Sequence, residues 1–204
     1  MKTLDGIAVI GLTGQSGAGK SAASKIFSAC GIPVIDCDAV ARRVSAFPEF
    51  LEKISVAFPG CVDESGLLRR KLGSLVFNDR EKLREYGNII FPYITESIMS
   101  EIDSLKIGGA KLVILDAPTL FESGMNSVCA EIISVIAPFD LKLRRVLERD
   151  NIPVEFAQSR LSSQFSEKYF YDRSDAVIVN DGSLEDLEEK VRAIAADLKE
   201  RFNA

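Results

Sequence analysis

The sequence contains no histidine, and no apolar run approaches the 18 or so residues that cross a bilayer. Without imidazole the protein cannot use a histidine-dependent catalytic triad, a histidine-ligated zinc site or a histidine general base. Any acid–base chemistry at neutral pH must therefore fall to Asp, Glu, Lys, Tyr or Cys. The absence of a long apolar run argues against a membrane-spanning helix.

The 204 residues carry a formal net charge of −5, and the isoelectric point near 5.0 argues against a general nucleic-acid or anionic-membrane surface. The segment Met1–Asp5 leads directly into a strand pattern, so we expect no signal peptide. The cysteines show no CxxC spacing and are expected to be free thiols: Cys30, Cys37, Cys61 and Cys129. Together these features predict a cytoplasmic protein with neither nucleic-acid nor membrane partners.

Five short, almost continuously apolar runs predict strands buried on both faces of a parallel sheet. They are Ile7–Leu12, Ile32–Asp36, Leu112–Asp116, Ile132–Ala137 and Ala176–Asn180. Helical spacing lies between them, as at Tyr93–Leu105, which Gly108–Gly109 would end, and at Leu184–Leu198, with Ser183 as N-cap. Strands alternating with helices indicate an α/β fold of three layers with a five-stranded parallel sheet.

The chain between the second and third strands is far longer than a simple crossover, since residues 37–111 comprise 75 positions. We therefore expect one domain with two helical excursions. The expected core is 1–38, 108–139 and 174–204, with a helical insertion over about 39–107 and an arginine-rich helical stretch over about 140–173.

A glycine-rich motif follows the first strand and precedes a helical pattern. Gly14-Gln15-Ser16-Gly17-Ala18-Gly19-Lys20-Ser21 matches GxxxxGK[ST] in full. Glycines let backbone N–H groups converge on phosphate oxygens, and the helix adds its positive N-terminal end. We expect nucleotide phosphates to bind over Gly17, Ala18, Gly19, Lys20, Ser21 and Ala22. Lys20 would reach the β- and γ-phosphates, and the Ser21 hydroxyl would ligate Mg²⁺.

The same segment admits two other interpretations. Gly17–Ala22 also satisfies the dinucleotide pattern GxGxxG/A, with Asp36 or Asp38 about 20 residues on. That fingerprint starts immediately at the strand end, whereas Gly17 lies five residues past Leu12. A glycine-rich turn without a ligand is the remaining alternative. The Lys-Ser pair after the last loop glycine favours the phosphate loop.

Two carboxylates, Asp36 and Asp38, stand where the second strand ends. Ligands of open α/β sheets sit outside the carboxyl ends of the strands, so these acids should face the γ-phosphate end of the loop. In a protein without histidine, a carboxylate is the natural group to accept a hydroxyl proton during phosphoryl transfer. One of the two could instead cap the following helix, a role that suits Asp38.

The third strand ends in Asp116 after four aliphatic residues, the pattern of an acid that holds the Mg²⁺ shell through water or Ser21. Capping of a turn is the alternative. Pro118 and Glu122 follow, and we expect them at the mouth of the same cleft.

The stretch after the fourth strand concentrates positive charge in an acidic protein: Lys142, Arg144, Arg145, Arg149, Arg160 and Lys168. One interpretation is a lid that closes over the triphosphate and excludes water. The other is a set of surface charges paired with Glu148, Asp150 and Glu155. We favour the lid role for Arg145 first and surface pairing for most of the rest.

Taken together, the phosphate loop, Asp36-Cys37-Asp38, the stretch Asp116–Glu122 and the arginine-rich segment resemble the dephospho-coenzyme A kinase family. Further fragments that fit are Gly31–Asp36, Arg149-Asp150, Arg160 with Ser163-Gln164, and Ser174–Asn180. The resemblance runs from Ile7 to Lys190. It implies a P-loop nucleotide-kinase-like core with an acceptor-side helical domain and a lid.

The resemblance also implies a reaction and residue roles. The family transfers the γ-phosphoryl group of ATP to the ribose 3′-hydroxyl of dephospho-CoA, the last step of coenzyme A synthesis, with Mg²⁺. By position, Asp38 resembles the base and Arg145 the lid arginine. Asp36, Pro118 and Glu122 fall on the acceptor side. Arg42 and Arg69 resemble residues that meet the acceptor's phosphates.

The chain departs from the family pattern at Phe91-Pro92, where the family usually has His-Pro, and at Ala22, where it often has Thr. The first departure bears on acceptor binding more than on chemistry. Two alternatives to the dephospho-CoA kinase remain: a P-loop kinase for another nucleotide-like or small alcohol acceptor, and a nucleotide-binding regulator with little catalysis. We expect a monomer or weak homo-oligomer.

Overall fold

The computed structural model describes residues 3–204. Met1 and Lys2, at the start of the segment in which we predicted no signal peptide, lie outside the described residues. The described chain divides into two compact units, residues 3–35 with 104–204, and residues 36–103. Helix α5 (Arg80–Ile107) belongs mostly to the second unit. No helix within residues 3–204 is both long and apolar enough to span a membrane.

The first unit is built on a five-stranded sheet of order β2-β5-β1-β6-β7. Its strands are β1 (Ala8–Gly14), β2 (Val34–Asp36), β5 (Leu112–Asp116), β6 (Glu131–Ile136) and β7 (Ala176–Val179). Central β1 is buried along its whole length and pairs in parallel with β5 and β6. All five predicted strands are present, and their ends differ from the prediction by at most two residues.

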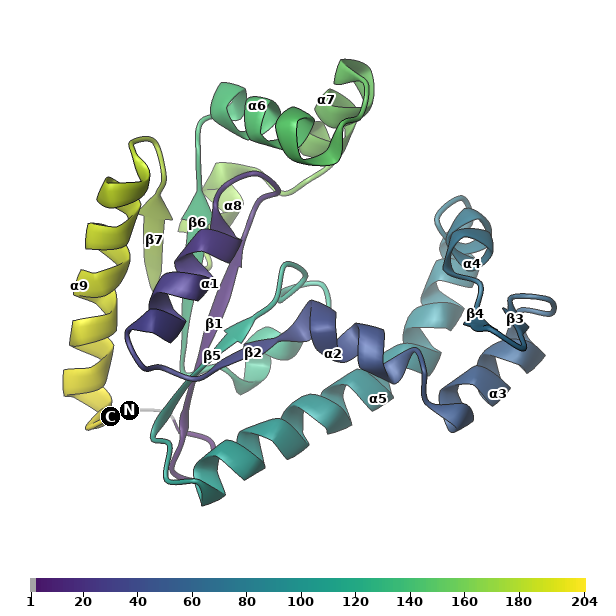
Figure 1. The fold of residues 1–204 in the computed structure, drawn as a ribbon, viewed down its shortest axis with the longest axis horizontal. Coiled ribbons are helices and arrows are strands. Elements are labelled where there is room, and N and C mark those ends of the chain that lie inside the picture. The colour runs from purple at the N-terminus through teal and green to yellow at the C-terminus, as the bar shows by residue number, and fades with distance from the viewer. Residues whose placement is uncertain (1–2) are drawn as a thin grey trace. The chain divides into compact units, whose positions relative to one another are not determined.

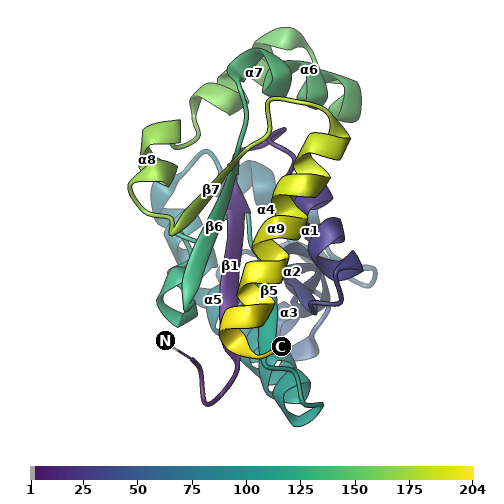
Figure 2. The ribbon, with the colours of Figure 1, turned by 90° about the vertical axis from the view of Figure 1, so that its left-hand side faces the viewer.

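Helices cover the sheet because each presents an apolar stripe. In Figures 1 and 2, α1 (Lys20–Ala29) and α9 (Leu184–Phe202) lie side by side on one face. Phe27 of α1 and Val191 of α9 are fully buried in the core cluster with Leu12 and Val135 of the sheet. Ser183 caps α9 as predicted, and Asp186 completes a capping box with it.

Three shorter helices connect β6 to β7: α6 (Phe139–Asp150), α7 (Val154–Ser162) and α8 (Glu167–Tyr171). Helices α6 and α7 form a hairpin with a small core of its own, made by Val146, Ala157 and Leu161. The hairpin lies beyond the carboxyl ends of β1 and β6 (Figure 1), whereas α8 packs against β6 and β7. This position brings the arginine-rich stretch to the edge of the sheet where the phosphate loop begins.

The second unit contains α2 (Cys37–Val44), α3 (Pro48–Ala57), α4 (Arg69–Val76) and most of α5. The two-residue strands β3 (Val62–Asp63) and β4 (Gly66–Leu67) form an antiparallel hairpin that the expectation of a helical insertion did not include. Helix α5 starts at Arg80, earlier than the apolar spacing from Tyr93 predicted, and contains Pro92. Edge-to-face contacts of Phe50 with Tyr93 and of Phe58 with Tyr86 hold the helices together.

Candidate functional site: a phosphate loop and an amphipathic cavity

The phosphate loop joins β1 to α1 in a conformation that its glycines make possible. Gly14, Gly17 and Gly19 all have positive φ, at 148°, 77° and 105°. A Cβ on Gly17 would lie 2.7 Å from the Lys142 carbonyl oxygen, and one on Gly19 would lie 2.2 Å from Asn180 Nδ2. The backbone therefore needs glycine both for its dihedral angles and for close packing. β1 continues through Gly14, two residues beyond the predicted end, because Thr13 and Gly14 pair with β6.

The residues after the loop glycines begin α1, so their amides point out of the helix N-terminus. Lys20 is the first residue of the helix, and its Nζ forms an ion pair with the Asp116 carboxylate at the end of β5. Both side chains are nearly buried, at 14% and 9% exposed. Ser21 is exposed beside Lys20, and Ala22 is half-buried. The structure thus brings together the loop, Lys20 and Asp116.

Arg145 reaches the outer side of the same loop from α6. Its Nη1 lies 3.3 Å from the Gly17 carbonyl oxygen and 3.5 Å from that of Ala18. Asn180, at the end of β7, donates from Nδ2 to the Ala18 carbonyl at 2.7 Å and is only 5% exposed. These contacts hold the loop carbonyls from two elements. Within the loop, the Ala18 amide donates to the Gln15 carbonyl at 3.1 Å.

Arg149 and Arg160 of the hairpin are exposed, and Arg149 Nη2 also donates to Ser16 Oγ of the loop at 3.5 Å. Arg149 and Arg160 both form ion pairs with Asp150, at 2.6 and 2.7 Å. The hydrogen bonds from Arg149 are the main cause that lowers the pKa of Asp150 below its ordinary value of 3.8. This agrees with the surface-pair interpretation for these two arginines, with Asp150 as the shared partner.

The fit of the site to Mg²⁺ can be judged from its donors. Within residues 3–204 no three His, Cys, Asp or Glu side chains gather into a metal cage. Mg²⁺ is typically held by one or two carboxylates together with substrate phosphates and waters. This site offers the Ser21 hydroxyl and the Asp116 carboxylate next to a loop suited to phosphates. These donors fit Mg²⁺.

Asp36 and Asp38 take different structural roles. Helix α2 begins at Cys37, one residue after the strand, so Asp36 is the N-cap and its Oδ1 accepts from the Ala39 amide at 2.9 Å. The suggestion that Asp38 is the cap is wrong for that reason. Asp38 lies in the first turn of α2 and is exposed.

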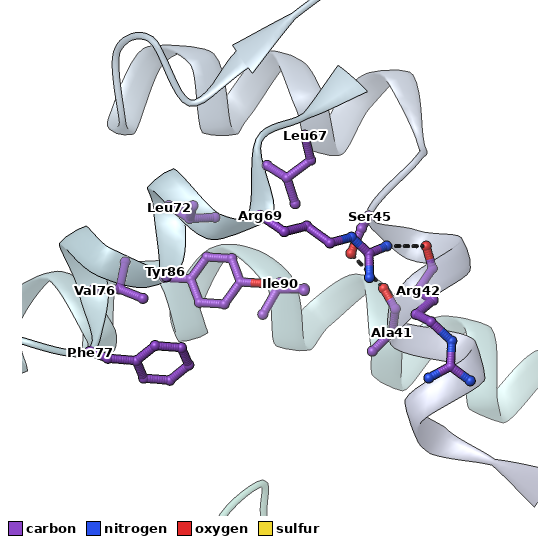
Figure 3. Close-up of a pocket in the computed structure, with 11 residues that line it drawn as sticks. Ala41, Arg42, Ser45, Leu67, Arg69, Leu72, Val76, Phe77, Tyr86 and Ile90 are labelled. Atoms are coloured by element: carbon purple, nitrogen blue, oxygen red, sulfur yellow. Dashed lines mark hydrogen bonds between the residues drawn. The ribbon is translucent and has the colours of Figure 1, made fainter. Parts of the chain in front are cut away.

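Arg42 and Arg69 meet in the second unit at a cavity of about 220 Å³. Arg69 Nη2 donates to the Arg42 carbonyl at 3.3 Å, and the Arg42 side chain instead extends away, with its guanidinium 3.7 Å from Asp36 (Figure 3). The apolar part of the lining is formed by Leu67, Leu72, Val76, Phe77 and Ile90. The hydroxyl of Tyr86 points toward Arg69 between these two regions (Figure 3), and burial raises the pKa of this tyrosine.

The remaining predicted residues lie after β5 or on α5. Pro118 is half-buried after β5, and its carbonyl accepts from Thr13 Oγ1 at 3.4 Å; Glu122 is exposed farther along. Phe91, at the usual histidine position, is 44% exposed on α5 and lies against Gly87. None of the four cysteines forms a disulfide, and Cys37 is half-buried.

Sequence reasoning missed four residues around the loop: Gln15, Lys142, Gln164 and Asn180. Gln15 and Lys142 are 7% and 4% exposed, and the Lys142 Nζ donates to Gln15 Oε1 at 2.5 Å. Burial lowers the pKa of Lys142. The signals in the sequence did not indicate a role: Gln15 stands inside the motif, Lys142 belongs to the basic stretch, and Gln164 and Asn180 fall in fragments that resemble the family.

Comparison with known proteins identifies the family. The sequence model of the family "Dephospho-CoA kinase" matches residues 8–186. A dephospho-CoA kinase of Geobacillus kaustophilus is 37% identical over 188 residues, covering 91% of this chain and 94% of the relative. A solved structure of a Thermus thermophilus protein superposes with a TM-score of 0.83 at 35% identity and covers 94% of this chain and 98% of that one.

A more distant structure shares only the fold. Shikimate kinase from Acinetobacter baumannii has a TM-score of 0.54 at 17% identity, over 95% of each chain. The α/β fold with a parallel five-stranded sheet is therefore that of P-loop kinases, as the sequence predicted. With a family match over most of its length and relatives above 30% identity, the chain belongs to the dephospho-CoA kinase family.

Proposed function

We propose that this protein transfers the γ-phosphoryl group of ATP to the ribose 3′-hydroxyl of dephospho-CoA, giving CoA and ADP as the last step of coenzyme A synthesis. Membership of the family supports the choice of acceptor. The observation that carries the phosphoryl chemistry is the convergence of Lys20, Asp116 and Arg145 on one phosphate loop. The loop supplies the amides that this chemistry requires, and the two cations supply charge.

In the proposed reaction Asp38 accepts the proton of the 3′-hydroxyl as the acceptor oxygen bonds to the γ-phosphorus. The bond from that phosphorus to the β–γ bridging oxygen breaks, and ADP leaves with the electron pair. Asp38 is the better choice of base because Asp36 already accepts the Ala39 amide, whereas the exposed Asp38 carboxylate has no ion pair within residues 3–204. A carboxylate base suits a chain that lacks histidine.

Lys20 would contact the β- and γ-phosphates, and Arg145 would neutralise charge on the transferring group. Ser21, and Asp116 through water, would hold Mg²⁺. The ion, when bound, neutralises phosphate charge and orients the β- and γ-oxygens. Gly17–Ala22 supply the backbone of the phosphate site.

On the acceptor side we propose Asp36, Arg42, Arg69, Pro118 and Glu122. The cavity beside Arg69 combines a cation with an apolar wall. That chemistry suits an acceptor that carries phosphates on a long, largely uncharged arm. The division into core, insertion over about 39–107 and lid over about 140–173 is part of the same proposal, with closure of the lid excluding water.

The test is an acceptor panel. Purified protein with Mg-ATP is incubated with dephospho-CoA, with adenosine, with pantetheine 4′-phosphate and with small alcohols including shikimate, and CoA and ADP are measured. Rapid formation of CoA from dephospho-CoA alone is expected. Turnover of another acceptor instead would favour a kinase of different specificity, and ATP binding without turnover would favour a regulator.

The compartment and the oligomeric state are further parts of the proposal. Four cysteines without a disulfide suit a reducing compartment, which supports action in the cytoplasm. We also propose a monomer or weak homo-oligomer, because the roles assigned above use residues of one chain. Sedimentation equilibrium across a hundredfold concentration range would detect a stable dimer if one forms.

A further inference from the structure

We propose that Gln164 is a positioning residue that holds the phosphate loop in its ATP-binding conformation through the backbone of Ser16. This inference rests on the proposed function for its catalytic consequences, but its ATP-binding consequences can be tested without any acceptor. Gln164 lies just after α7, and its Oε1 accepts from the Ser16 amide at 3.0 Å across 148 positions of the chain.

The bond fixes the loop immediately before the residues that face phosphate. Ser16 precedes Gly17, whose positive φ starts the turn that leads to Lys20. An amide held by a side-chain oxygen cannot rotate freely, so the direction of the next peptide units is restricted as well. Loss of the bond would leave a glycine-rich segment with many accessible conformations.

A second link, through Gln15, reinforces the first. Its Nε2 donates to the Phe165 carbonyl at 2.9 Å, and its Oε1 accepts from Lys142 Nζ. Both ends of the amide are therefore occupied, which determines its orientation in a nearly fully buried site. Lys142 also lies 3.8 Å from Glu167, so its buried charge has a carboxylate nearby.

These links attach both ends of the α6–α7 hairpin to the loop. Lys142 stands in the first turns of α6, and Gln164 and Phe165 follow α7. Between these two attachments the hairpin carries Arg145 to the loop carbonyls. The position of Gln164 therefore affects the position of Arg145 as well as the orientation of the loop amides.

The decisive variant is Gln164→Met, which keeps the length of the side chain and removes the acceptor oxygen. Its matched control is Gln158→Met, at an exposed glutamine on α7 of the same hairpin. ATP affinity is measured by calorimetry without acceptor, and kinetics are measured with dephospho-CoA. We expect a threefold to tenfold weaker ATP affinity in Gln164→Met, as for the loss of a hydrogen bond of about 1 kcal/mol. The KM for dephospho-CoA should be unchanged, and Gln158→Met should match the wild type.

Amide exchange followed by NMR provides a direct readout of the bond. The Ser16 amide of the nucleotide-free wild type should be protected, and Gln164→Met should lose that protection. Gln164→Glu should keep it, because a carboxylate oxygen still accepts. A merely structural role would lower the melting temperature without changing ATP affinity, and that result would overturn the proposal. An unprotected Ser16 amide in the wild type would also overturn it, even if the variants failed to fold.

The same data separate this inference from the proposed function. If the wild type binds ATP but makes no CoA, the proposed acceptor is wrong. The ATP affinities of Gln164→Met and its control can still be compared. A wild type that makes CoA, with Gln164→Met binding ATP as tightly as the control, contradicts only the role of Gln164.

Discussion

The ammonium group of Lys20 forms an ion pair with the carboxylate of Asp116. Lys20 is the first residue of α1, and Asp116 is the last residue of β5. The two opposite charges meet where both side chains are largely shielded from water. Bound phosphates would compete with Asp116 for the lysine. The carboxylate would then be available to the water shell of a metal ion.

Replacement of Asp116 by Asn should therefore separate metal dependence from nucleotide binding. We expect the Mg²⁺ concentration for half-maximal activity to rise by about tenfold or more, since a ligand with full charge is lost. ATP affinity without Mg²⁺ should not weaken, because Lys20 no longer has a competing partner. Activity titrated with Mg²⁺ and calorimetry in EDTA measure the two effects. Asp197→Asn, at an exposed carboxylate on α9, is the control; equal Mg²⁺ dependence in both variants would contradict the role of Asp116.

The parts of the site that the sequence predicted are those with local signals. The loop motif, the acid at the end of β5 and the Ser183 cap each depend on a few consecutive residues, and short-range chemistry determines them. The fragment Ser163-Gln164 resembles the family, but the contact of Gln164 with Ser16 could not be predicted. A single polar side chain that reaches a distant amide creates no local pattern that indicates its partner.

Three differences in the fold have equally specific causes. The choice between Asp36 and Asp38 as cap depended on whether the helix starts at Cys37 or Ala39. This difference of two residues is within the uncertainty of a predicted helix boundary. Strands of two residues, such as β3 and β4, are too short to show alternation. The interior Pro92 obscured the continuity of α5.

The two aspartates after β2 should respond differently to substitution. Asp38→Asn should lower kcat by about 10²- to 10⁴-fold with little change in ATP affinity, because a proton acceptor is lost. Asp36→Ala should mainly reduce stability, by about 1 kcal/mol for a lost N-cap. Asp36→Asn keeps a capping side chain and serves as the control for both. Near-normal turnover in Asp38→Asn together with an inactive Asp36→Asn would reverse the assignment of the base.

The stability of the protein should depend on pH through the ion pairs of Asp150 with Arg149 and Arg160. Hydrogen bonds from Arg149 lower the pKa of Asp150 in the folded protein below the ordinary 3.8, so the unfolded chain binds the proton first as the pH falls. The stabilisation is complete above pH 3.8 and is lost as the pH falls through the folded-state value. Asp150→Asn should lower the melting temperature by about 2 to 4 °C at pH 6, and the difference from the wild type should shrink below pH 3.8.

Calorimetric melting from pH 6 to pH 3 measures this difference. Asp172→Asn, which breaks only the exposed pair with Lys168, should change the melting temperature little at any pH. A constant difference between Asp150→Asn and the wild type over the whole range would show that the ionisation of Asp150 is not the cause.

Substitution of Arg69 should weaken binding of the acceptor and leave binding of ATP unchanged. Arg69 lines the cavity in the second unit together with Arg42, whereas the adjacent Arg70 on α4 does not line that cavity. Arg69→Gln should raise the KM for dephospho-CoA by about 10- to 100-fold, the range for a lost hydrogen bond to a charged phosphate, and leave the KM for ATP within twofold. Arg70→Gln removes the same charge one residue away and should leave both constants unchanged. If the two variants raised the acceptor KM equally, a general loss of positive charge would be the cause, and the cavity would not be the site of acceptor binding.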